Sequence, residues 1–179
     1  MLSKDQTIVV LVDVQGKLAE IVYNSEQILI NLSKLIQGVQ LLEIPIIWLE
    51  QYPEGLGETA DVLKKHLSGQ EPIRKTTFSA CRSPEFTEAL KAARRPQVLV
   101  AGIEAHVCVY QTAAMLKEQD YEVEVVADAV SSRTKQNKEI GLAKMQHLGI
   151  APTSVEMALY ELMEKAGTPT FKKVLKVIK

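Results

Sequence analysis

Cys108 is a candidate nucleophile because of its place in the segment VLVAGIEAHVCVYQTAA (Val98–Ala114). An apolar run that predicts a strand breaks at Gly102, and a helical pattern begins at or just after the cysteine. The first turn of a helix has unpaired N–H groups and partial positive charge, which together favour a thiolate over a thiol. The alternative interpretation is a small apolar residue that is simply buried in the core.

Two other predicted strands also end in charged residues. Asp13 follows the apolar run TIVVLV, and Lys75 lies within the segment IRKTT. Taken singly, an acid in this place often only caps a loop, and most lysines are solvated. Ligands of open parallel sheets bind outside the carboxyl ends of the strands. We therefore expect Asp13, Lys75 and Cys108 to converge at that edge of a sheet.

The pattern along the whole chain predicts such a sheet. Short β-branched runs alternate with segments of helical period, and the runs are apolar throughout, so helices should cover both faces. We expect a single-domain, three-layer α/β/α structure with a parallel sheet. The predicted strands are 7–12, 44–49, 73–77, 97–101, 122–127 and a weak one around 150. The predicted helices are 25–43, 60–67, 84–95, one from about 108, 137–148, 155–165 and an amphipathic segment at 168–179.

Several local signals refine these helices. The Asn24 to Gln27 spacing predicts a capping box at the start of helix 25–43, and Ser154 is expected to cap helix 155–165. The segment 168–179 has an apolar face bordered by four lysines. This segment is suited to a membrane or a partner, but we expect it to dock onto its own subunit or a neighbouring one.

Composition limits the classes of function. A chain of 179 residues that is 46% hydrophobic fits one compact domain, which buries about 70% of its unfolded surface. The net charge of -1 leaves no basic face for nucleic acid or an anionic membrane. The start MLSKDQ lacks the pattern of a signal peptide, and no apolar run is long enough to span a bilayer. Two cysteines, Cys81 and Cys108, make no disulfide framework, so we expect a cytoplasmic protein.

The residues singled out above resemble the isochorismatase-like cysteine hydrolase superfamily through most of the chain. The segments that carry the resemblance are Asp13 with Gln15 in a D-x-Q motif, Lys75 in RKTTFSA, Cys108 in GIEAHVCV, and the later ADAVSSR (127–133) and TSVE (153–156). The resemblance implies a six-stranded parallel sheet and a homo-oligomer, commonly a dimer, tetramer or octamer.

A triad of these residue types supports hydrolysis. Asp13 would take the thiol proton, Lys75 would stabilise the thiolate, and Cys108 would attack a carbonyl or imino carbon to form a covalent intermediate. Asp13 would return the proton to the departing amine before water releases the acyl group. The resemblance also implies a cis peptide before Glu104, which would turn the N–H groups of Glu104 and Cys108 into an oxyanion hole. The expected substrate pocket comprises Gln15, Tyr52, Phe78 and His106.

Two departures narrow the subfamily. Nicotinamidases of the superfamily hold a metal with an Asp-x-His pair and further histidines after the second strand, but this chain reads WLEQYP there. The three histidines show no ligand spacing, and no nucleotide-binding glycine motif follows the first strand, so we expect neither a metal nor a cofactor. The loop EQYPEGLG (50–57) looks like the isochorismatase-domain-containing subgroup.

The leading prediction is a cysteine hydrolase that cleaves a C–N bond of a small amide-type substrate through a thioester-type intermediate. One alternative is vinyl ether hydrolysis of the isochorismatase type, although several true isochorismatases lack the cysteine. The other is a non-catalytic oligomeric interaction protein or a thiol sensor. Cys81 as a redox partner of Cys108 is a weaker hypothesis.

Overall fold

The computed structural model describes all 179 residues and contains one six-stranded sheet with the order β3-β2-β1-β4-β5-β6. Every neighbouring pair of strands is parallel, which confirms the predicted fold class. The strands are β1 (Thr7–Val12), β2 (Ile46–Gln51), β3 (Ile73–Lys75), β4 (Gln97–Ile103), β5 (Glu122–Ser131) and β6 (Ala151–Thr153).

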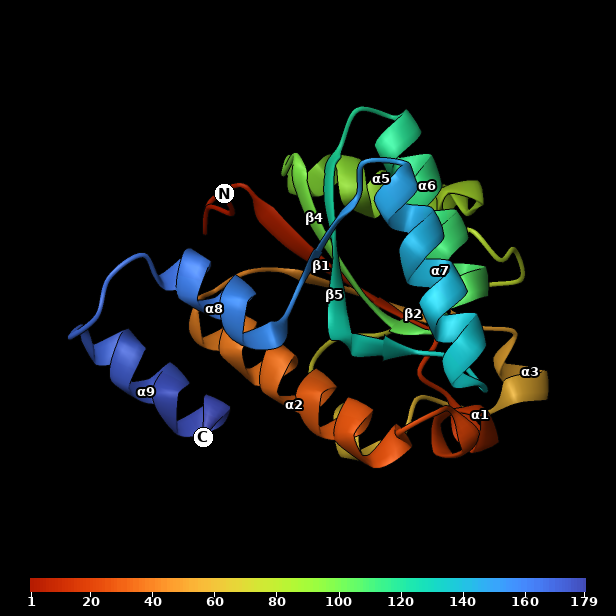
Figure 1. Ribbon diagram of the computed structural model, residues 1–179, viewed down its shortest axis with the longest axis horizontal. Coiled ribbons are helices and arrows are strands. Elements are labelled where there is room, and N and C mark those ends of the chain that lie inside the picture. The colour runs from red at the N-terminus through yellow and green to blue at the C-terminus, as the bar shows by residue number, and fades with distance from the viewer.

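Helices cover both faces of this sheet (Figure 1). One apolar core joins the sheet to α1 (Gly16–Ile21), α2 (Ser25–Leu41), α4 (Asp61–Lys64), α8 (Val155–Met163) and α9 (Pro169–Ile178). A second core joins the opposite face to α5 (Pro84–Ala93), α6 (Tyr110–Glu118) and α7 (Lys135–His147). Every residue of β1, β2 and β4 is buried, which explains why these strands are apolar without alternation.

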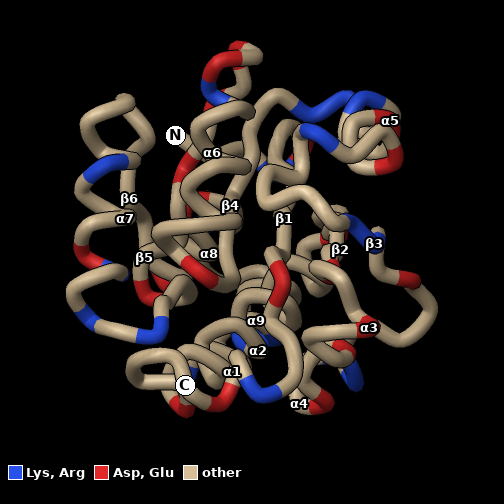
Figure 2. The backbone as a smooth tube through the Cα atoms, turned by 90° about the vertical axis from the view of Figure 1, so that its right-hand side faces the viewer, with Lys and Arg blue, Asp and Glu red and all other residues tan.

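Three short helical segments lie at the carboxyl edge of the sheet. They are α3 (Pro53–Leu56), η1 (Ala80–Arg82) and η2 (Ala105–Val109), the last being a π-helical turn. Acidic and basic residues are interspersed along α5 and α7 (Figure 2), as the small net charge suggests. No helix is both long enough and apolar enough to cross a lipid bilayer.

The helix caps follow the sequence in one place and depart from it in another. The Ser154 side chain accepts a hydrogen bond from the Met157 N–H, so the predicted cap of α8 is confirmed. The predicted capping box at Asn24 is wrong. Asn24 has a left-handed backbone with φ of 56° and makes no cap, and Gln27 instead donates to the Asn31 side chain at 2.9 Å.

The predicted break at Gly102 is also wrong, because β4 continues through this residue to Ile103. Gly102 pairs with Val12 of β1 and has φ of 119°, a conformation that favours glycine. A Cβ atom here would lie 2.8 Å from the Val12 N and C atoms. The absent side chain therefore lets β1 and β4 approach each other just before Asp13 and the turn that carries Cys108.

The amphipathic C-terminal segment packs on its own subunit as α9. Val174 is fully buried in the core that includes α2 and α8, and the Phe171 ring meets the Tyr160 ring edge-on at 6.5 Å. Lys34 of α2 donates to the Ile178 carbonyl at 2.6 Å. These contacts confirm the expectation that the apolar face is used for docking.

Candidate active site

The candidate site lies where the winding of the sheet reverses, between β1 and β4. Asp13 directly follows β1, the turn η2 that carries Cys108 follows β4, and Lys75 ends β3. All three side chains are buried, with residue exposures of 2% for Asp13, 5% for Lys75 and 7% for Cys108. Ligands of doubly wound sheets bind at this switch point, so the location suits an active site.

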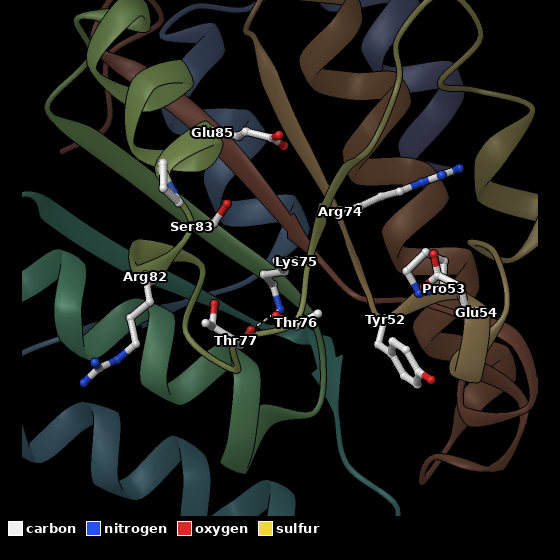
Figure 3. A pocket seen from close by; sticks show the side chains of 11 residues that line it. Tyr52, Pro53, Glu54, Arg74, Lys75, Thr76, Thr77, Arg82, Ser83 and Glu85 are labelled. Carbon is white, nitrogen blue, oxygen red and sulfur yellow. Dashed lines mark hydrogen bonds between the residues drawn. The ribbon is translucent and has the colours of Figure 1, made fainter.

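Lys75 is held by four oxygen atoms around its ammonium group. Its Nζ donates to Asp13 Oδ2 and to Gln51 Oε1, both at 2.7 Å. The carbonyl oxygens of Thr77 and Phe78 lie farther away, at 3.2 and 3.4 Å. Figure 3 shows the Lys75 side chain beside Thr77. Because the ammonium has only three hydrogens, the two short contacts fix its position.

Asp13 uses only one of its two carboxylate oxygens in this ion pair. Its Oδ1 atom is buried and has no hydrogen-bond partner. Burial raises the pKa of Asp13, whereas the charge of Lys75 and the nearby Cys108 thiol lower it. A buried carboxylate that has one unpaired oxygen and a thiol nearby can accept a proton.

The surroundings of Cys108 favour the thiol, in contrast to the thiolate that the nearby helix start led us to expect. Burial and then the negative charge of Asp13 raise its pKa to about 12, and Lys75 lowers it less. The helical segment begins at Ala105, so Cys108 is its fourth residue and packs in the second core. Here desolvation and the adjacent carboxylate outweigh the helix terminus.

The peptide between Ile103 and Glu104 is cis, as the family resemblance implies. Glu104 is 8% exposed, and its Oε1 accepts from the Arg133 N–H at 3.0 Å and from Arg133 Nε at 3.1 Å. The Glu104 carbonyl accepts from the N–H groups of Val107 and Val109, which starts the turn η2. An oxyanion hole formed by the Glu104 and Cys108 N–H groups stays a prediction.

The residues predicted to form the pocket are placed differently from one another. Tyr52 and Phe78 are 54% and 56% exposed, whereas Gln15 has no exposed surface. The Gln15 amide is engaged with the main chain of Gln51 and with the Gly57 carbonyl. His106 is half-buried, with Nδ1 3.0 Å from Ser132 Oγ.

A cavity of about 410 Å³ lies beside the edge strand β3 (Figure 3). Its lining includes Tyr52, Arg74, Lys75 and Arg82, with a single hydrophobic residue among eleven. Asp13 and Cys108 do not line it. The cavity therefore adjoins the triad through Lys75 without containing the nucleophile.

Sequence reasoning missed Gln51, which ends β2 between the strands that carry Asp13 and Lys75. An amide at the end of an apolar strand has no distinctive sequence pattern. Cys81 lies at Thr112 of α6, with its Sγ 3.8 Å from the Thr112 carbonyl, and burial raises its pKa to about 11. No group of three or more histidine, cysteine, aspartate or glutamate side chains is arranged to hold a metal ion.

Comparison with known proteins agrees with the fold and with the family resemblance. The family model of the isochorismatase domain matches residues 7–157. Isochorismatase domain-containing protein 2 of Danio rerio is 35% identical over 178 residues, which is 99% of this chain and 89% of that protein. The structure of MAR1 ribonuclease from Caenorhabditis elegans is 36% identical, with a TM-score of 0.92 over 99% of this chain and 91% of that one.

A likeness in fold alone extends to the YcaC gene product of Escherichia coli, described as an octameric hydrolase of unknown specificity. It is 22% identical, with a TM-score of 0.92 over 98% of this chain and 89% of that one. The family match covers most of the chain, and the first relative is similar over nearly its full length. This chain therefore belongs to the isochorismatase domain family.

Proposed function

We propose that this protein is a cysteine hydrolase that cleaves a C–N bond of a small amide-type substrate. The observation that carries the proposal is the buried Asp13 carboxylate, which pairs with Lys75 through Oδ2, leaves Oδ1 without a partner, and lies near enough to the Cys108 thiol for the two groups to shift each other's pKa. This arrangement provides a nucleophile, a proton acceptor and a fixed cation in one desolvated place.

In the proposed first half-reaction, the Cys108 proton moves to Asp13 Oδ1 while the sulfur bonds to the substrate carbonyl carbon. The carbonyl oxygen takes up the negative charge and is stabilised by the N–H groups of Glu104 and Cys108. The C–N bond then breaks, and Asp13 gives its proton to the departing nitrogen. The products of this half-reaction are an amine and a thioester on Cys108.

In the second half-reaction, Asp13 takes a proton from water as the water oxygen attacks the thioester carbon. The C–S bond breaks, the acid product leaves, and the sulfur regains its proton from Asp13. Lys75 keeps its charge throughout and balances the negative charge on whichever partner carries it. The cycle needs no group beyond the residues named and one water molecule.

The test is a screen of small amides with the parent protein, followed by Cys108→Ser and Asp13→Asn. Each variant should lose turnover by at least about a thousandfold, because each removes a partner of the covalent step. The matched control is Cys81→Ser, a buried thiol that contacts Thr112 and not Asp13, and it should retain activity. A folded Cys108→Ser variant that hydrolyses amides at the parent rate would refute the mechanism.

The same variants separate other activities suggested by the relatives. Vinyl ether hydrolysis would survive Cys108→Ala but not Asp13→Asn, because it needs an acid rather than a thiol. The name of the Caenorhabditis elegans relative suggests RNA as a further substrate to screen. A central carboxylate and a net charge of -1 do not favour a polyanion. Reversible Cys108 oxidation without turnover of any substrate would instead indicate a thiol sensor.

We also propose that the protein forms a homo-oligomer, supported by the octameric YcaC protein of the same fold. Light scattering coupled to gel filtration would give the number of subunits. A cytoplasmic location stays part of the proposal, and fractionation of the cells that make the protein would test it.

A further inference from the structure

The geometry points to Gln51 as a positioning residue that holds the Lys75 ammonium against Asp13 Oδ2 and so leaves Oδ1 for the proton of Cys108. This inference rests on the proposed function, in which Asp13 is the proton acceptor. Gln51 Oε1 lies 2.7 Å from Lys75 Nζ, the same distance as Asp13 Oδ2. The ammonium is therefore held equally closely from two sides.

The orientation of the Gln51 amide is set by a second contact. Its Nε2 donates to the Thr76 carbonyl at 2.7 Å, so its oxygen is left to face the ammonium. Gln51 is 7% exposed, and water has little access to replace either contact. A side chain whose donor and acceptor ends are both engaged cannot turn without losing two hydrogen bonds.

The main chain of Gln51 is fixed as well. The Gln15 amide accepts from the Gln51 N–H at 2.6 Å and donates to the Gln51 carbonyl at 3.1 Å. Gln15 also donates to the Gly57 carbonyl at 2.6 Å, which ties this unit to the loop after β2. Gln15 therefore positions the main chain of Gln51, and the Gln51 side chain positions Lys75.

Loss of the Gln51 acceptor should loosen the ion pair rather than abolish it. The carbonyls of Thr77 and Phe78 lie 3.2 and 3.4 Å from Lys75 Nζ in the parent structure. Without the Gln51 acceptor, the ammonium would move toward these carbonyls and away from Asp13 to replace the lost hydrogen bond. Weaker attraction from Lys75 raises the pKa of Asp13, which Lys75 normally lowers. A carboxylate in place of the amide would compete for the same ammonium and raise the pKa of Asp13 further.

The experiment compares the parent protein with Gln51→Met and Gln51→Glu, and with Gln146→Met on the exposed side of α7 as a matched control. Alkylation of Cys108 by iodoacetamide is followed against pH, site-resolved by mass spectrometry. The pH at which the alkylation rate of Cys108 reaches half of its value on the acid side should rise in the order parent, Gln51→Met, Gln51→Glu. In the control variant this midpoint should equal that of the parent. Where an amide substrate is turned over, kcat should fall about tenfold or more in Gln51→Met with little change in KM.

Equal midpoints in the parent and both Gln51 variants would overturn the inference, because a purely structural role lowers rates without moving the titration. A Cys108 that reacts at no pH would also overturn it, since Asp13 would then not accept the thiol proton. Ordered midpoints without turnover of any amide would uphold the role of Gln51 and count against the proposed function. Turnover of an amide with unmoved midpoints would support the proposed function and overturn the role of Gln51.

Discussion

Replacement of Gly102 by alanine should destabilise the protein and displace Asp13 together. Gly102 has φ of 119°, and an added Cβ would lie 2.8 Å from Val12 N and C and closer still to its carbonyl oxygen. Real Cβ contacts essentially never fall below 3.0 Å, so β1 and β4 would have to separate. Because Val12 directly precedes Asp13, this separation changes the position of the carboxylate.

The magnitude has two parts. A backbone conformation essentially limited to glycine costs about 1 to 3 kcal/mol when another residue must adopt it. Moving the two strands apart weakens the ladder hydrogen bonds around Val12, at about 1 kcal/mol for each of about two bonds. The sum is a loss of about 3 to 5 kcal/mol in the free energy of unfolding. With a urea m-value of about 2 kcal/mol per molar, the unfolding midpoint falls by about 2 M.

Gly69→Ala separates the two parts in the same assay. Gly69 has φ of 92°, but a Cβ there would meet no atom within 4 Å, so only the conformational cost remains. Urea unfolding followed by circular dichroism should therefore show a loss of about 1 to 3 kcal/mol for Gly69→Ala and clearly more for Gly102→Ala. Equal losses in the two variants would refute the reasoning, because the approach of β1 to β4 would then contribute nothing.

Four further predictions concern the site. Gly141→Ala places a Cβ 2.6 Å from the Ala105 carbonyl, where η2 starts. The kcat/KM for an amide that the parent protein hydrolyses should therefore fall about tenfold. The free energy of unfolding should fall by only about 1 to 2 kcal/mol. The rate against pH should have an acid limb above the ordinary Asp range, since burial raises the pKa of Asp13, and no alkaline rise until near the Cys108 value of about 12. In Lys75→Met the acid limb should move to higher pH, because Lys75 lowers the pKa of Asp13. The variant should also lose about 3 to 5 kcal/mol in the free energy of unfolding at neutral pH. This loss should shrink on acidification, because the folded variant binds the Asp13 proton more tightly than the unfolded chain does. Cys108 should be alkylated faster than Cys81, although its pKa of about 12 exceeds the value of about 11 for Cys81, because the proposed base Asp13 is near Cys108. Faster alkylation of Cys81 would contradict Asp13 as the base.

Much of the fold follows from the sequence because burial on both faces of a parallel sheet demands apolar strands without alternation. The errors occur where one contact decides a local conformation. Gly102 breaks the apolar pattern yet continues β4, since its missing side chain admits Val12. β5 runs on to Ser131 through a register shift, and Asp128 in that stretch accepts from the Val155 N–H at 2.9 Å at the start of α8. Neither contact is encoded in periodicity.

The location of the site was predictable for a topological reason, whereas its electrostatics were not. Parallel strands bring their carboxyl ends to one edge, so residues 13, 75 and 108 could be assigned to a common region without any distance. The protonation of Cys108 depends on how deeply the turn is buried and on the nearness of Asp13, which lies far away in sequence. Gln51 escaped notice for the same reason, since only the three-dimensional structure places its amide on Lys75.

Burial of the triad has opposite effects on the two partners of the proposed proton transfer. It raises the pKa of Cys108, which makes the thiol a weaker acid, and it raises the pKa of Asp13, which makes the carboxylate a stronger base. Moving the proton from sulfur to Oδ1 leaves one negative charge and one ammonium in the site, so most of the desolvation cost cancels between the two states. The remaining energy difference between the two states depends on the distance of that ammonium from the sulfur and from the carboxylate. A fixed Lys75 can serve both states only if something other than Asp13 holds it in place, and Gln51 is the side chain that does so.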